Sequence, residues 1–134
     1  MDIVDLHHVA LPTRDLARSI AFYSDCFGLA QVERPAFKTT GAWFQAGAKI
    51  LHLVLNPDGL FRPHSRLDTG DGHFAVNVRD FDNAMNEIKS YGYREDLPDG
   101  DPMRLVVVRN SAAGFLQAYI LDPDRNIIEI NSAS

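Results

Sequence analysis

The sequence has one cysteine, one tryptophan and no long hydrophobic run. Its single cysteine, Cys26, excludes an internal disulfide and agrees with a reducing compartment. Uninterrupted apolar runs, such as residues 105–108, are far shorter than the roughly 20 residues that a membrane-spanning helix needs. The first residues do not show a basic stretch followed by an apolar block, so we expect no secretory signal. These features together predict a cytoplasmic protein that does not enter membranes.

The sequence also has fewer basic than acidic residues. The 134 residues include 13 Lys and Arg against 18 Asp and Glu, which gives a net charge of -5. Nucleic-acid binding depends on clustered basic side chains that neutralise phosphates, so we expect no nucleic-acid partner. The arginine pairs Arg62/Arg66 and Arg104/Arg109 leave two alternatives open: a local site for a small anion, or solvated surface. A small molecule is therefore the expected partner.

An internal repeat organises the chain, which we expect to form one domain over residues 1–134. Two strand-like histidine segments are each followed by an aspartate, an amphipathic stretch and a glycine: His8, Asp15 and Gly28, then His73, Asp80 and Gly92. The two histidines are 65 positions apart, and so are the two aspartates. The aspartates suit helix N-caps and the glycines suit helix C-terminal stops. Each copy therefore begins with a strand and a helix.

Further strand-like segments follow each helix. Alternating or continuous apolar residues separated by Gly and Pro turns predict the following strands: 5–12, 30–34, 42–45 and 49–55, then 72–79, 103–109, 117–121 and 127–131. The predicted fold is α+β, with two tandem βαβββ modules that form a curled mixed sheet around a metal-binding cavity. Module one covers about residues 5–58 and module two about 70–131, with residues 56–72 between them.

Four residues at corresponding points of the repeat are candidate metal ligands. His8 and His73 lie in the first strand of their modules, and His52 and Glu129 in the last. A buried imidazole needs a partner for each ring nitrogen, and an unpaired carboxylate among isoleucines is costly. Glu129 pointing to solvent, with Ile128 and Ile130 facing the core, is the open alternative. Three imidazoles and one carboxylate suit Zn, Ni, Fe, Mn or Co, and suit Ca or Mg poorly.

Several stretches carry a family resemblance. They are LHHVALPTRDLARSIAFYSDCFGL (6–29), GHFAVNVRDFDNAM (72–85) and YILDPDRNIIEI (119–130), which resemble the hallmark segments of the vicinal oxygen chelate superfamily. That superfamily includes glyoxalase I, bleomycin-binding proteins, fosfomycin-resistance enzymes and extradiol dioxygenases. GAWFQAGAKILHLV (41–54) resembles a glyoxalase-like branch that has a histidine where glyoxalase I has a glutamate. In the closing turn, Arg125 replaces a glycine that is common in the family.

The resemblance implies a divalent transition metal held by His8, His73 and Glu129, with His52 as a fourth candidate ligand. It further implies a homodimer, in which each site either draws on both chains or lies within one. The implied reaction is a lyase or isomerase step on a small substrate that chelates the metal through neighbouring oxygens. Glu129, or a metal-bound water, would move the proton.

Six residues are candidate substrate contacts: Phe37, Trp43, Phe44, Arg104, Arg109 and Tyr119. Core packing is the alternative for the aromatic ones. Two other functions are compatible with the same pattern. One is an iron-dependent dioxygenase, which needs only His8, His73 and Glu129. The other is a metal-free drug-binding resistance protein, whose relatives commonly lack the four ligand residues present here.

Overall fold

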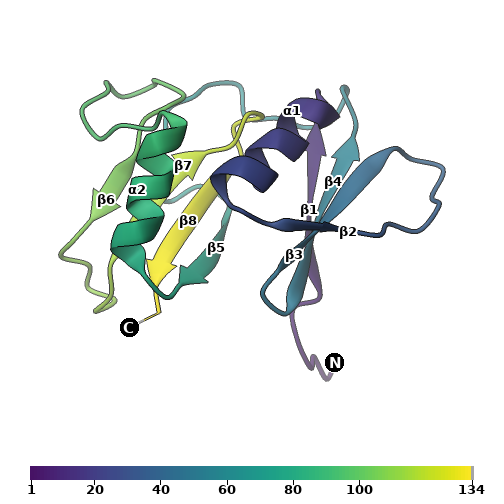
Figure 1. Cartoon of the computed structure of the whole chain (residues 1–134), viewed down its shortest axis with the longest axis horizontal. Coiled ribbons are helices and arrows are strands. Elements are labelled where there is room, and N and C mark those ends of the chain that lie inside the picture. The colour runs from purple at the N-terminus through teal and green to yellow at the C-terminus, as the bar shows by residue number, and fades with distance from the viewer. Residues whose placement is uncertain (134) are drawn as a thin grey trace.

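The computed structural model describes residues 1–133 and consists of two modules with the same order of elements (Figure 1). The first module contains β1 (His8–Thr13), α1 (Leu16–Ala21), η1 (Phe22–Cys26), β2 (Ala30–Val32), β3 (Gly41–Ala46) and β4 (Lys49–Leu55). The second contains β5 (His73–Val78), α2 (Phe81–Tyr91), β6 (Val106–Val108), β7 (Gln117–Leu121) and β8 (Ile127–Ser132). The predicted βαβββ repeat is confirmed, although β6 is shorter than the predicted strand 103–109.

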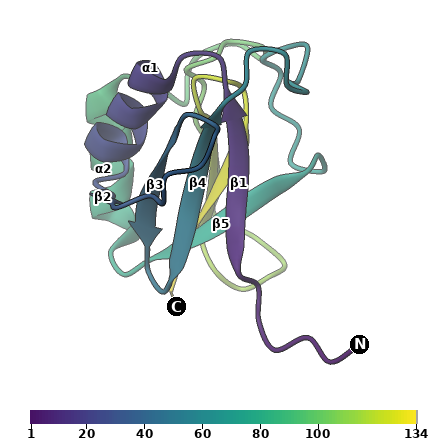
Figure 2. The same ribbon diagram turned by 90° about the vertical axis from the view of Figure 1, so that its right-hand side faces the viewer.

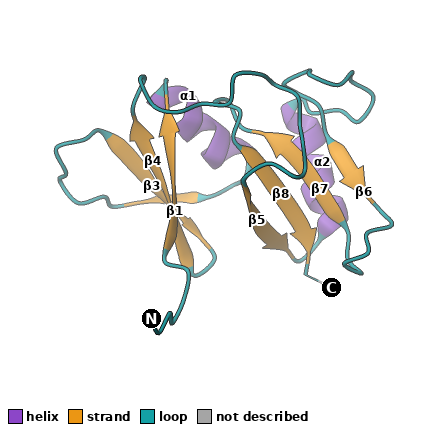
Figure 3. Ribbon diagram, turned by 180° about the vertical axis from the view of Figure 1, so that it is seen from behind, coloured by secondary structure: helices purple, strands orange, loops and turns teal. Residues whose placement is uncertain are grey.

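Each module forms its own four-stranded mixed sheet. The strand orders are β1-β4-β3-β2 and β5-β8-β7-β6, with the first pair parallel and the others antiparallel. The helices cover one side of each sheet (Figures 1 and 3). We call the opposite side of each sheet its open face. The two sheets do not close into one curled sheet, which corrects that part of the prediction: the edge strands β1 and β5 are not paired with each other.

Both helices begin where the sequence predicts. The Asp15 side chain accepts a hydrogen bond from the Arg18 amide at 3.0 Å, and Asp80 accepts one from Asn83 at 2.9 Å. These bonds satisfy amide groups that a helix start leaves without partners. Gly92 follows α2 with a φ of 126°, a left-handed value that a side chain would strain.

The first helix changes pitch halfway along its length. Residues 22–26 form a π-helical turn, η1, directly after α1. This turn carries Phe22, Tyr23 and Cys26, which are all buried in the core. The amphipathic stretch between Asp15 and Gly28 is helical as predicted, but it is divided into an α-helical part and a π-helical turn.

Strand alternation divides the side chains between the core and the open faces. Leu51 and Leu53 of β4, and Ile128 and Ile130 of β8, point to the helices and are at most 3% exposed. Because successive side chains point to opposite sides of a strand, the residues between them lie on the open faces. Glu129 is one of these residues. Part of the second sheet's open face is covered by the linker, through Leu67 (Figure 3).

Buried carboxylates in the turn between β7 and β8 join the two modules. Asp122 accepts a hydrogen bond at 2.6 Å from the hydroxyl of Tyr23 in η1. Asp124, only 1% exposed, accepts bonds from Thr13 Oγ1 at 2.5 Å and Ser19 Oγ at 3.1 Å, both in the first module. A buried carboxylate is tolerated only when donors compensate its lost hydration. The first module therefore supplies the donors that this turn of the second module requires.

The same turn contains Arg125, which replaces the glycine that is common at this position. This residue has a φ of 69°, in the left-handed region that favours glycine. Its guanidinium donates to the Arg62 carbonyl at 3.2 Å, a contact with the linker that glycine does not make.

Among the described residues, the longest helix is α2, and none of the helices is long and apolar enough to cross a membrane. This agrees with the sequence, in which no apolar run reaches the length of a span.

We expect Tyr23→Phe to lower the free energy of unfolding by about 1 to 3 kcal/mol, because it removes a donor from a buried carboxylate. Burial already raises the pKa of Asp122 above its ordinary value, and the Tyr23 hydroxyl opposes that shift. Urea unfolding at neutral pH measures the loss. The control is Tyr91→Phe, at a tyrosine that is 39% exposed, which should change stability by less than about 0.5 kcal/mol. Equal effects of the two substitutions would contradict the role given to Tyr23.

Candidate metal centre

The second module brings two of the candidate ligands into direct contact. His73 Nε2 lies 2.8 Å from Glu129 Oε2 on the open face, and His73 Nδ1 lies 2.7 Å from the Asp71 carbonyl oxygen. A carbonyl oxygen only accepts, so Nδ1 carries a proton and donates it there. That bond fixes the ring with Nε2 toward the carboxylate. It is also the largest contribution to raising the pKa of His73, which the Glu129 contact raises further against the effect of burial.

Glu129 is 7% exposed, although it does not belong to the core side of its strand. Burial opposes its ionisation, but hydrogen bonds outweigh that effect and lower the pKa of Glu129 below its ordinary value. The Gln117 side-chain amide donates to Glu129 Oε1 at 2.7 Å, and the contact with His73 engages Oε2. The alternative in which Glu129 points freely into solvent does not hold. Glu129 is an ionised, oriented carboxylate.

The first module places its two candidate ligands side by side. The His8 and His52 rings are stacked with centroids 4.1 Å apart, and the Trp43 ring stacks on the other face of His52 at 4.2 Å, with an angle of 6° between the planes. Burial in this stack, and then the neighbouring His8 ring, lower the pKa of His52. A lowered pKa leaves the ring neutral, which is the form that binds metals. His7 Nδ1 lies 2.8 Å from His8 Nδ1 at the start of the strand.

The two pairs occupy the same register positions in their sheets. His8 lies opposite Ile50, two residues before His52, and His73 lies opposite Ile127, two residues before Glu129. The aromatic partner is repeated as well, because Trp43 is paired with His52 and Tyr119 is paired with Glu129. Each module thus presents one two-residue half-site on its open face. We refer to these as the first half-site (His8 and His52) and the second half-site (His73 and Glu129).

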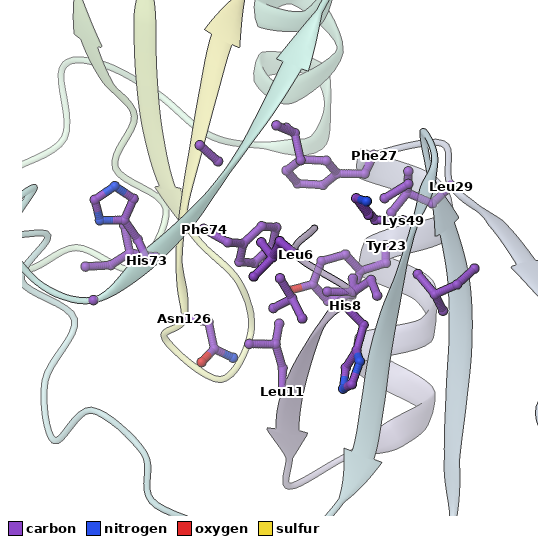
Figure 4. Close-up of a pocket in the computed structure, with 18 of the residues that line it drawn as sticks. Leu6, His8, Leu11, Tyr23, Phe27, Leu29, Lys49, His73, Phe74 and Asn126 are labelled. Atoms are coloured by element: carbon purple, nitrogen blue, oxygen red, sulfur yellow. The ribbon is translucent and has the colours of Figure 1, made fainter. Parts of the chain in front are cut away.

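Within one chain the half-sites stay apart. Among residues 1–133, no three His, Cys, Asp or Glu side chains lie close enough together to hold an ion. His8 and His73 line a cleft of about 710 Å³ between the modules, which His52 and Glu129 do not line. In Figure 4 the apolar side chains of Leu6, Leu11 and Phe74 lie between the two labelled histidines. In Figure 2, β5 crosses behind β4 and β1 at a steep angle to them.

The structure places the candidate substrate residues in different parts of the molecule. Trp43 and Phe37, whose ring centroids are 6.0 Å apart, lie beside the first half-site, and Tyr119 lies 5.9 Å from the His73 ring. Phe44 is wholly buried on the helix side of β3, because it alternates with Trp43, and this corresponds to the alternative of core packing. Arg109 forms an exposed ion pair with Glu95 at 2.9 Å.

The remaining candidate, Arg104, borders a shallow surface cavity of about 290 Å³ together with Arg66 and Val106. Its NH1 group lies 3.3 Å from Asp99 Oδ1. The structure thus places Arg104 beside the linker and away from the residues of both half-sites.

Two groups around the second half-site were missed by sequence reasoning. Gln117 is two residues before Tyr119 on β7, so strand alternation alone puts it on the same open face as Glu129. The Asp71 carbonyl was not foreseeable, because its position depends on how the linker enters β5. Residues that orient a ligand through its second atom are regular features of metal centres.

The donor set fits a transition metal. Neutral imidazole from His52, an oriented imidazole from His73 and an ionised carboxylate from Glu129 are the groups that such ions prefer. Each half-site alone offers two donors, whereas a tetrahedral zinc site has four ligands. A complete centre therefore requires the two half-sites to meet.

Comparison with known proteins shows the family of the chain. The profile described as the Glyoxalase/Bleomycin resistance protein/Dioxygenase superfamily matches residues 5–130. Curated proteins of Brassica oleracea and Arabidopsis thaliana are 26% and 25% identical over 127 residues, and the Arabidopsis protein is described as a lactoylglutathione lyase. These matches cover 92% of this chain but only 42% of the length of each relative.

Solved structures show the same fold. A lactoylglutathione lyase from Agrobacterium tumefaciens has a TM-score of 0.69 and 23% identity, over 99% of this chain and 96% of that one. A bleomycin-binding protein complexed with bleomycin has a TM-score of 0.70 and 23% identity, over 98% and 100%. A fosfomycin resistance protein from Listeria monocytogenes has a TM-score of 0.73 and 15% identity, over 99% and 96%.

We expect Gln117→Leu to raise the pKa of Glu129 in the metal-free protein, because a donor to the charged form is lost. Carbon NMR of the Glu129 carboxyl during a pH titration measures this shift. Gln45→Leu is the matched control, since Gln45 lies in β3 and donates to the Gly47 carbonyl. No change in the Glu129 pKa on Gln117→Leu, or the same change on Gln45→Leu, would contradict the role of Gln117.

Proposed function

Because the chain belongs to the glyoxalase/bleomycin resistance protein/dioxygenase superfamily, we propose that it is a metal-dependent lyase or isomerase. Its substrate is a small molecule that chelates a divalent transition metal through neighbouring oxygens. The observation that supports this proposal most is the repeated register of His8 with His52 and of His73 with Glu129. Packing alone gives no reason for imidazole and carboxylate groups at equivalent positions of two apolar strands.

We propose that a second copy of the chain completes the centre. The four residues lie on open faces, and one chain keeps its two half-sites apart. In a symmetric dimer, the first half-site of one protomer can face the second half-site of its partner, and the same contact then recurs by symmetry. Two centres would form, each with three imidazoles and one carboxylate. This accounts for half-sites whose side chains are ordered by their neighbours, although each half-site offers only two donors.

The reaction follows from the properties of these side chains. A bound divalent ion supplies Lewis-acid stabilisation of negative charge on the substrate oxygens. Glu129 accepts the proton from the carbon next to those oxygens, since its lowered pKa keeps it ionised near neutral pH. Gln117 orients the carboxylate through Oε1, while Oε2 lies toward the half-site, 2.8 Å from His73 Nε2. His8, His52 and His73 bind and orient, with His73 fixed by the Asp71 carbonyl.

We expect the purified protein to contain about one divalent ion per chain, measured by elemental analysis. With the preferred metal, it should catalyse exchange of the carbon-bound proton of hydroxyacetone or 2-hydroxyacetophenone with solvent deuterium, measured by NMR. Glu129→Gln should lower that exchange by at least about 100-fold, because it removes the base. Gln45→Leu should leave it unchanged.

Other outcomes identify the rival functions. A protein that takes up no metal but binds a drug would be a binding protein of the same fold. Oxygen consumption with a catechol, dependent on Fe(II), would identify a dioxygenase. Full exchange activity in Glu129→Gln together with retained metal would contradict the role proposed for Glu129.

A further inference from the structure

An aromatic ladder extends away from the first half-site. Ring stacking runs from His8 to His52 and then to Trp43, and Phe37 continues the row with its centroid 6.0 Å from Trp43. Phe37 is 54% exposed, which is unusual for a large apolar ring and marks a candidate contact surface. The ladder begins at two candidate ligands and ends at a free aromatic surface.

Phe37 is held in place although it is exposed. The Arg34 guanidinium lies over its ring at 4.9 Å, and the same guanidinium donates to the Thr39 carbonyl and hydroxyl oxygens, both at 2.8 Å. These contacts order the segment between β2 and β3, so the ring is presented in one position. A preorganised ring loses little conformational freedom when a ligand stacks on it.

The open face of the second sheet is also apolar next to its half-site. Tyr119, Leu121 and Ile127 form a cluster there, packed against Leu67, Val106 and Val108. Tyr119 is the residue paired with Glu129. Apolar side chains therefore flank the candidate ligands on both sheets.

Four basic side chains are already paired with carboxylates of this chain. The pairs are Lys49 with Asp5, Arg62 with Asp71, Arg104 with Asp99, and Arg109 with Glu95. Arg34, whose guanidinium lies over the Phe37 ring, donates to the uncharged oxygens of Thr39. A glutathione conjugate has free carboxylates on its peptide and needs cations to bind them. These arrangements favour an uncharged substituent.

We propose that the site takes a substrate whose chelating oxygens carry a planar apolar group, an aryl group in particular, and that Trp43 and Phe37 select it. The inference rests on the proposed function, because the metal holds the oxygens next to the ladder. Trp43 and Phe37 are thus specificity-determining residues. Ring stacking adds to the affinity gained from burying apolar area.

Binding of mandelate and lactate to the Zn²⁺-loaded protein tests this inference. Both are α-hydroxy carboxylates with the same neighbouring oxygens, and they differ in a phenyl against a methyl group. Calorimetry should show mandelate binding at least about tenfold more tightly than lactate. Mandelate should also change the emission of Trp43, which is the only tryptophan in the sequence.

Phe37→Leu should reduce the preference for mandelate by roughly threefold or more, since it keeps an apolar side chain and removes the ring. The matched control is Tyr91→Leu, at an exposed aromatic on the helix side, which should leave the preference unchanged. Circular dichroism checks that both variants keep the fold.

Two failures are distinguishable. Stoichiometric zinc uptake with equal affinity for mandelate and lactate, or tighter binding of S-lactoylglutathione than of mandelate, would overturn the aryl preference and leave the proposed function intact. A protein that takes up no zinc would contradict the proposed function and, with it, this inference.

Discussion

The buried carboxylates of Asp122 and Asp124 set the arrangement on which everything else depends. Both lie in the turn between β7 and β8, and their donors Tyr23, Thr13 and Ser19 come from the first module. Leaving either carboxylate without its donors inside the protein would cost several kcal/mol. The two modules of one chain are therefore fixed side by side through the helix side and the turn.

This arrangement decides where the candidate metal ligands can meet. With the helix sides joined, the open faces of both sheets remain available, and the cleft between β1 and β5 separates His8 from His73. The half-sites have matching registers but do not converge within the chain. In the dimer that we propose, two-fold symmetry would bring the first half-site of each protomer to the second half-site of the other without changing the buried turn.

Much of the fold could be predicted because it follows from local patterns. The helix starts at Asp15 and Asp80 depend on side-chain capping bonds that are local in sequence, and the strands follow from alternation. The π-helical turn could not be predicted, because a shift of the hydrogen-bond register leaves no distinct residue pattern. The separate sheets depend on pairing between distant strands. The burial of Phe44 could have been predicted, because strand alternation makes Phe44 and its neighbour Trp43 face opposite sides of the sheet.

The individual residues of the candidate site could be predicted from the sequence, but their arrangement in space could not. The internal repeat identified His8, His52, His73 and Glu129, and the structure shows their common register. The contacts of Gln117 and the Asp71 carbonyl, which orient Glu129 and His73, depend on strand pairing and on the path of the linker. Whether the half-sites join within a chain or between chains depends on the packing of modules, which a sequence pattern does not contain.

Metal binding by two differently composed heterodimers tests the shared centre most directly. In one, a His8→Ala chain is paired with a Glu129→Ala chain; in the other, a chain with both substitutions is paired with an unchanged chain. If the centres are shared, the first heterodimer keeps one intact centre and binds one ion tightly, whereas the second has a defect in both centres and binds none tightly. Centres within single chains would give the reverse result, which would contradict the account.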